Sequence, residues 1–210
     1  RYAKGTINGD GSVTWGAVEQ VTNVNFTTSW FQNPTIIVKD NVPYIATEYR
    51  SSGSYYGITI LTKNFTTKDT DGDVNYLDGY VKADWGSKVI YNVGSYTQSS
   101  PCAIFVPQSV NGLPNGRIWV AWQGKDSTDS AVDNVRVSYS DDGGVTWSSM
   151  QKLTSGNANS QGAVSITVNK NNKVFILFAD GTGGTGYDIS VISNDGTGWD
   201  YYDPKELFPN

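Results

Sequence analysis

The chain has 210 residues, no histidine, one cysteine and a formal net charge of −5 at pH 7. The lack of histidine excludes serine–histidine catalysis and histidine-ligated zinc within this chain, and a single cysteine cannot form an intrachain disulfide. Scattered basic residues argue against nucleic acid as a partner, and the absence of a run of about 18 apolar residues means that no membrane-spanning helix is predicted.

Residues 1–21 are predicted to contain two strands around a turn at Asn8–Trp15. Within this turn Asp10, Thr14 and Trp15 keep a spacing that recurs further along the chain. The segment therefore corresponds to the last two strands of a longer repeated unit.

Strand-like apolar segments follow at matching intervals, four to a unit. Three complete units cover residues 33–91, 100–153 and 162–203. This pattern predicts an all-β chain of four-stranded antiparallel sheets, with residues 1–210 as a single region. Cys102 falls on a predicted inner strand, where a small buried apolar side chain is expected rather than a nucleophile.

The first unit contains an acidic insertion at Lys68–Asp78. Its acids alternate around a glycine, and hard cations prefer several such oxygen ligands on a turning backbone. The segment resembles the calcium loops of dockerins and thrombospondins at its start, but it lacks the glycine after the third acid. A calcium site and a bare acidic turn both stay open. The calcium ligands would be Asp69, Asp71, Asp73 and Asp78.

The second unit contains the clearest turn motif, at Ser140–Trp147. Ser140 and Asp142 are placed to accept hydrogen bonds from turn backbone donors, Gly144 tolerates positive φ, and Trp147 can fold back onto the base of the hairpin. The third unit carries a shorter copy with Asp195 and Trp199.

The spacing Ser-x-Asp-x-Gly-x-Thr-Trp, formed by Ser140, Asp142, Gly144, Thr146 and Trp147, resembles the Asp box of sialidase-like β-propellers, also called the BNR repeat. The resemblance implies a β-propeller with four-stranded blades, of which this chain supplies about three and a half. Because such a number cannot close a ring, we expect the chain to be part of a larger propeller, or to be closed by other copies of itself. In that family the Asp-box turns lie away from the substrate, so their residues are expected to be structural.

Ligands of such propellers usually meet the loops after the second and fourth strands of each blade. Aromatic rings beside amides and carboxylates suit sugars, although they also occur on protein-binding surfaces. The candidate ligand-binding residues on that side are Trp30, Glu48, Arg50, Tyr55, Tyr56, Gln123, Asp126 and Asp180.

Catalysis of the sialidase kind needs residues that this chain does not supply. Sialidases use three arginines to clamp a carboxylate, and this chain has only four arginines, of which Arg117 and Arg136 fall in or beside predicted strands. The clamp cannot be assembled. Other glycosidases need two carboxylates, which Glu48, Asp126 or Asp180 could provide if they are not simply solvated loop acids.

An extracellular or cell-surface location is expected from the composition, rich in Tyr, Thr, Ser, Asn and Gly. The sequons at Asn25 and Asn64 add N-glycosylation candidates. The leading hypothesis is recognition or adhesion through a glycan or a surface protein. The alternatives are a glycoside hydrolase, or a fragment of one, and a structural subunit of an extracellular assembly such as a surface layer or fibre. No cofactor is required, with calcium as the one candidate.

Overall fold

The computed structural model describes residues 1–22, 30–50, 56–65, 81–82, 84–107, 112–155, 159–182 and 186–202. The described residues contain strands and no helix, and their sheets are antiparallel, which confirms the predicted all-β class. In the described part of the chain, no helix could span a membrane.

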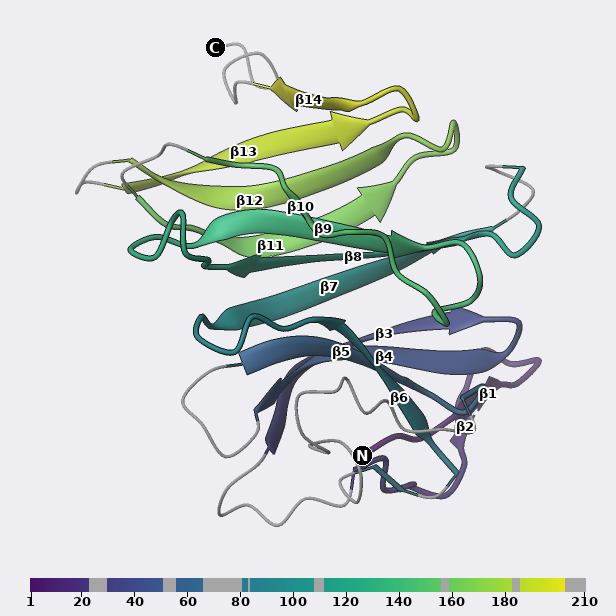
Figure 1. Ribbon diagram of the computed structural model, residues 1–210. Helices are drawn as coiled ribbons and strands as arrows, with labels where there is room; N and C mark the ends of the chain where they lie inside the picture. Colours follow the sequence, from purple (N-terminus) through teal and green to yellow (C-terminus); the bar gives the residue numbers. More distant parts are fainter. Residues whose placement is uncertain are drawn as a thin grey trace.

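The described residues form three four-stranded sheets and one two-stranded hairpin (Figure 1). The N-terminal hairpin comprises β1 (Gly5–Ile7) and β2 (Val13–Trp15). Sheet A comprises β3 (Trp30–Lys39), β4 (Val42–Arg50), β5 (Tyr56–Thr62) and β6 (Gly86–Tyr91). Sheet B comprises β7 (Gln98–Val106), β8 (Arg117–Gly124), β9 (Asn134–Ser140) and β10 (Gln151–Lys152). Sheet C comprises β11 (Gln161–Val168), β12 (Val174–Thr182), β13 (Gly186–Asn194) and β14 (Trp199–Tyr202).

The sheets stack face to face in chain order, with the N-terminal hairpin and sheet C at opposite ends of the stack (Figure 1). The first strands are neighbours, since β3 contacts β7 and β7 contacts β11. One apolar core fills the space between sheets A and B, around Tyr44, Ile60 and Trp122. A second core lies between sheets B and C, around Trp119 and Ile176.

Each first strand carries a β-bulge at the same place. The register shifts between Gln32 and Thr35, between Ser99 and Cys102, and between Gly162 and Ser165. One non-glycine residue in each bulge is left-handed, with φ near 50°: Asn33, Ser100 and Ala163. The strands therefore run further than the sequence predicted, because Asn33-Pro34 and Ser100-Pro101 look like strand ends and instead form bulges.

The turn at Ser140–Trp147 is held by its own side chains. Ser140 Oγ accepts a hydrogen bond from Gly144 N at 2.8 Å, and Asp142 accepts from both the backbone N and the Oγ1 of Thr146. Gly143 and Gly144 have φ of 76° and 92°, which an L side chain adopts only with strain. Trp147 Nε1 donates to Gly144 O at 3.0 Å, so the ring closes over the turn.

We predict that Asp142→Ala lowers the free energy of unfolding by about 1 to 2 kcal/mol, because the Thr146 donors lose a charged acceptor. Burial acts to raise the pKa of Asp142, but hydrogen bonds from Thr146 outweigh it and hold the pKa below its ordinary value. Since a depressed pKa stabilises the fold only above the unfolded value, the difference between variant and wild type should shrink as pH falls through the pKa of folded Asp142. Urea unfolding at neutral and acidic pH measures both effects. An equal loss in Asp84→Ala, which removes an acid whose side chain is 64% exposed, would contradict the assignment.

Candidate functional site

Glu48 lies inside β4, fully buried, and is not the solvated loop acid considered from the sequence. Its carboxylate accepts hydrogen bonds of 2.6 Å from Gln32 Nε2, from Asn33 Nδ2 and from the backbone N of Ser100. The last of these crosses from sheet A to the bulge of sheet B. Glu48 therefore joins two sheets, and its oxygens are already engaged by protein donors.

Gln123 has the corresponding role in sheet B. It pairs with Ser99 just before the bulge of β7, as Glu48 pairs with Gln32 before the bulge of β3. Its Oε1 accepts from the backbone N of Ala163, the left-handed residue of the sheet C bulge, at 3.0 Å. Gln123 is thus a strand residue that links sheets.

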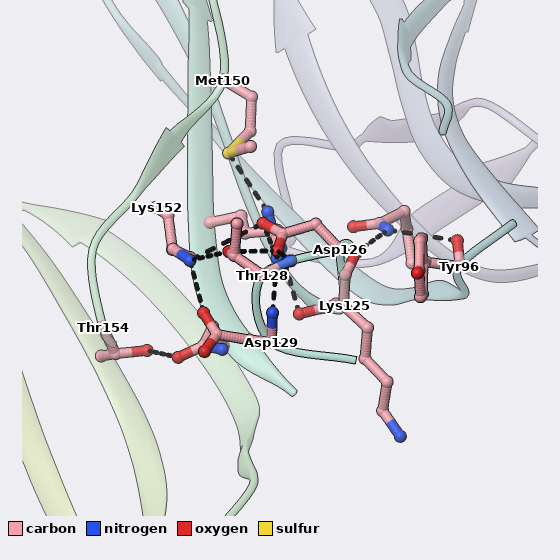
Figure 2. Close-up of polar contacts among 12 residues, drawn as sticks. Tyr96, Lys125, Asp126, Thr128, Asp129, Met150, Lys152 and Thr154 are labelled. Atoms are coloured by element: carbon pink, nitrogen blue, oxygen red, sulfur yellow. Dashed lines mark hydrogen bonds and ion pairs between the residues drawn. The ribbon is translucent and has the colours of Figure 1, made fainter. Parts of the chain in front are cut away.

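Asp126 begins the loop between β8 and β9 and is tied to a buried arginine (Figure 2). Its Oδ2 lies 2.8 Å from Arg136 Nη2, and the side chain of Arg136 is 0% exposed. Its Oδ1 accepts from the backbone N and the Oγ1 of Thr128, and Lys152 bonds to Asp129 alongside. Burial acts to raise the pKa of Asp126, but the bonds from Thr128 and Arg136 outweigh it and hold the pKa far below its ordinary value. Both carboxylate oxygens of Asp126 are therefore engaged by donors within the protein.

Further hydrogen bonds close the loop against sheet B. Gln98 Nε2 donates to the backbone oxygens of Tyr96 and Lys125 (Figure 2). Its Oε1 accepts from Trp122 Nε1 at 2.9 Å. Arg136 Nε donates to Gly124 O at 3.0 Å. Side-chain hydrogen bonds therefore hold this end of the loop against sheet B.

A hollow of about 440 Å³ opens where sheets B and C meet at their loop ends. Its size falls within the range of small-molecule sites. Sheet B contributes Gln123 and Asp133, and the rest comes from the start of β11 and from β12. The lining residues are Gln123, Asp133, Ser160, Gln161, Gly162, Ala163 and Ala179.

Asp133 is the titratable group of the hollow. Burial raises its pKa, and nearby Lys125 and a hydrogen bond with Ser160 only partly oppose that effect. The backbone of Asp133 also joins its loop to the start of β11, because Asp133 N donates to Ser160 Oγ and Gln161 N donates to Asp133 O. A half-buried carboxyl with a raised pKa in a concave site is a candidate functional group.

Asp180 lies beside this hollow, in β12 rather than in a loop. Its Oδ1 accepts from Gln161 Nε2 at 3.0 Å, and its Oδ2 accepts from Tyr201 Oη at 3.2 Å. Gln161 therefore bonds to Asp133 through its backbone and to Asp180 through its side chain. The sequence did not single out Asp133 or Ser160. The only signal for Asp133 was its position at the end of the loop that also holds Asp126.

The other predicted ligand-side residues are spread over sheet A. The Arg50 guanidinium lies 5.5 Å from the centroid of the Tyr56 ring, and Trp30 begins β3. Tyr55 lies outside the described residues. Arg50 and Tyr56, whose side chains the structure describes, do not line the hollow beside Asp133.

Several modification and metal predictions fall outside the described residues, namely those at Asn25, Asp69, Asp71, Asp73 and Asp78. The portion of the chain that is described contains no cluster of three His, Cys, Asp or Glu side chains able to hold a metal. Asn64 is described, and the amide nitrogen that a glycan would occupy donates to Tyr44 Oη at 2.7 Å. Burial raises the pKa of Cys102 to about 12, which makes its thiol a poor nucleophile.

No protein-family model matches the chain, and no curated protein matches it. A solved structure of a protein of unknown function from Dyadobacter fermentans is similar, with a TM-score of 0.54 and 14% sequence identity. The match covers 86% of this chain and 56% of that one. At this identity the likeness concerns the fold alone.

We predict that Asp126→Asn lowers the free energy of unfolding by about 3 to 5 kcal/mol, because it leaves the buried Arg136 guanidinium without its anionic partner. Thermal and urea unfolding would measure the loss. Asp129→Asn is the matched control, and its loss should be smaller because the Lys152 side chain that it pairs with is partly exposed. Equal losses in the two variants would contradict the role given to Asp126.

Proposed function

We propose that this chain is an arc of a sialidase-like β-propeller that recognises a small polar ligand, with carbohydrate as the first ligand class. Support for the architecture comes from three successive four-stranded antiparallel sheets stacked through their first strands, and from the side-chain-bonded turn at Ser140–Trp147. Extracellular location, a protein-surface ligand and calcium in the acidic insertion stay predictions.

One observation carries the recognition proposal, the hollow of about 440 Å³ that holds Asp133. Sugar hydroxyls both donate and accept hydrogen bonds, so they need a wall of mixed polarity. Asp133 supplies an acceptor when ionised, Ser160 offers a hydroxyl, and Gln161 lies between two acids. Gly162, Ala163 and Ala179 give small apolar surface between these polar groups.

We predict that Asp133→Asn weakens glycan binding roughly tenfold, because an ionised carboxylate is a stronger acceptor for hydroxyl donors than an amide oxygen. Wild-type affinity should rise as pH increases through the pKa of Asp133, which lies above the ordinary value of about 3.9, and the variant should lose this rise. Calorimetric titration with hits from a glycan panel measures both.

Asp40→Asn is the control for that titration, since Asp40 is an exposed acid that pairs with Lys39 away from the hollow. Failure of every panel member to bind would overturn the carbohydrate proposal. Binding that is equally strong in Asp133→Asn would overturn the assignment of the site.

Glycoside hydrolysis is the second candidate, favoured by the two acids that flank Gln161. Asp133, with its raised pKa, would be the general acid, and Asp180 the second carboxylate. The wild-type protein should release free sugar from members of a glycoside panel, and both Asp133→Asn and Asp180→Asn should abolish that release. This pair of results would establish hydrolysis. Binding without release leaves recognition as the function.

A further inference from the structure

The N-terminal hairpin exposes an apolar face. Gly5 pairs with Trp15 and Ile7 pairs with Val13, so the side chains of Ile7, Val13 and Trp15 share one face of the two strands. These three are 77%, 44% and 68% exposed. A cluster of large exposed apolar side chains on one hairpin marks an interaction surface.

The turn of this hairpin repeats the turn between β13 and β14. Asp10 Oδ1 accepts from both the N and the Oγ of Ser12, as Asp195 Oδ1 accepts from both the N and the Oγ1 of Thr197. In both turns a glycine with positive φ follows the aspartate. The turn between β1 and β2 is therefore the counterpart of the turn between β13 and β14, and the latter has a known place in the stack. The strand pairing differs, because Trp15 pairs with Gly5 outside the turn and Trp199 pairs with Asn194 beside Asp195.

The β13–β14 hairpin packs on sheet B. The Trp199 ring meets the Trp119 ring edge to face with centroids 5.6 Å apart, and Trp199 Nε1 donates to Gln151 Oε1 at 2.8 Å. Its turn residue Asp195 lines one small hollow together with Arg117 and Trp119. The hairpin tryptophan thus covers an aromatic residue of the preceding sheet, and its acid lies by a basic residue.

Sheet C offers the same surface to a following hairpin. Counting from the bulges, Phe175 stands at the register of Trp119, Lys173 at that of Arg117, and Leu177 at that of Ala121. Ala121 is 0% exposed beneath sheet C, whereas Leu177 is 36% exposed.

A position in the third strand of sheet C shows the same difference in exposure. Ile189 of β13 is 59% exposed, and its register counterparts, Ile58 in sheet A and Val135 in sheet B, are both 0% exposed. The outer face of sheet C therefore has apolar positions that a neighbouring sheet covers elsewhere in the same molecule.

We propose that the N-terminal hairpin of one copy of this chain docks on the outer face of sheet C of a second copy. Trp15 packs over Phe175 and Leu177 as Trp199 packs over Trp119, and Asp10 faces Lys173 as Asp195 lies by Arg117. The two surfaces lie at opposite ends of the stack, so they cannot cover each other within one chain (Figure 1). The contact is head to tail, so it produces closed rings, of which a two-copy ring is the smallest, or open filaments.

The test is sedimentation of the full chain from micromolar to millimolar concentration. Wild type should associate reversibly, and Trp15→Ala and Leu177→Ser should each weaken association roughly tenfold or more, because each removes an apolar contact at the centre of the interface. Ile7→Ser provides a second hairpin variant, with circular dichroism as the folding check. Val145→Ser, which removes an exposed valine from another turn, should leave association unchanged.

Mixing the variants separates a head-to-tail contact from other modes. Trp15→Ala keeps an intact sheet C face and Leu177→Ser keeps an intact hairpin, so an equimolar mixture should form dimers with one chain of each kind and nothing larger. Wild type that stays monomeric at every concentration would overturn the proposal. Association that survives both substitutions, or a mixture that gives no dimers, would overturn it as well.

Discussion

The left-handed bulge at the start of each inner strand is the constraint on which the stacking depends. A backbone N–H turned out of its own ladder must find another acceptor, because leaving it unpaired costs as much as a lost hydrogen bond. Glu48 supplies that acceptor to Ser100, and Gln123 supplies it to Ala163. Each acceptor comes from the second strand of the preceding sheet, so the bond that satisfies the bulge also fixes the register between neighbouring sheets.

Glutamate and glutamine serve the same position with different results. Both side chains place an oxygen at the same distance from the backbone. The carboxylate of Glu48 also accepts hydrogen bonds from the side-chain amides of Gln32 and Asn33 in its own sheet. Both oxygens of this carboxylate are therefore bonded within the junction between sheets A and B. Gln123 brings a neutral amide to the next junction, and the hollow with Asp133 opens beside it. The opposite end of that junction is held by aromatic packing, with Trp199 on Trp119, so the loop end is the side where space can remain.

The strand pattern could be predicted because alternation and apolar runs report burial directly. The segment Val135–Ser140, for example, lies within β9. The bulges could not, since Asn33-Pro34 and Ser100-Pro101 carry the same local signal whether a strand ends or bends around them. Glu48 was placed in a loop for another reason: the apolar run of its strand ends at Ala46, although β4 continues to Arg50. Asp133 was missed for a different reason: its backbone bonds to Ser160 and Gln161, which are distant in the chain and meet it only after sheets B and C have stacked.

One loop between β8 and β9 contains two acids whose environments act in opposite directions. Asp126 is held ionised by Arg136 and Thr128 and is committed to the fold. Asp133, at the other end of the same loop, bears some of the desolvation cost of ionisation without an equally strong partner. Among the described residues, Asp133 lines the hollow and Asp126 does not, so only the second acid can meet a ligand there. A ligand hydroxyl that donates to Asp133 would relieve that cost, which is a physical reason for recognition to be centred there.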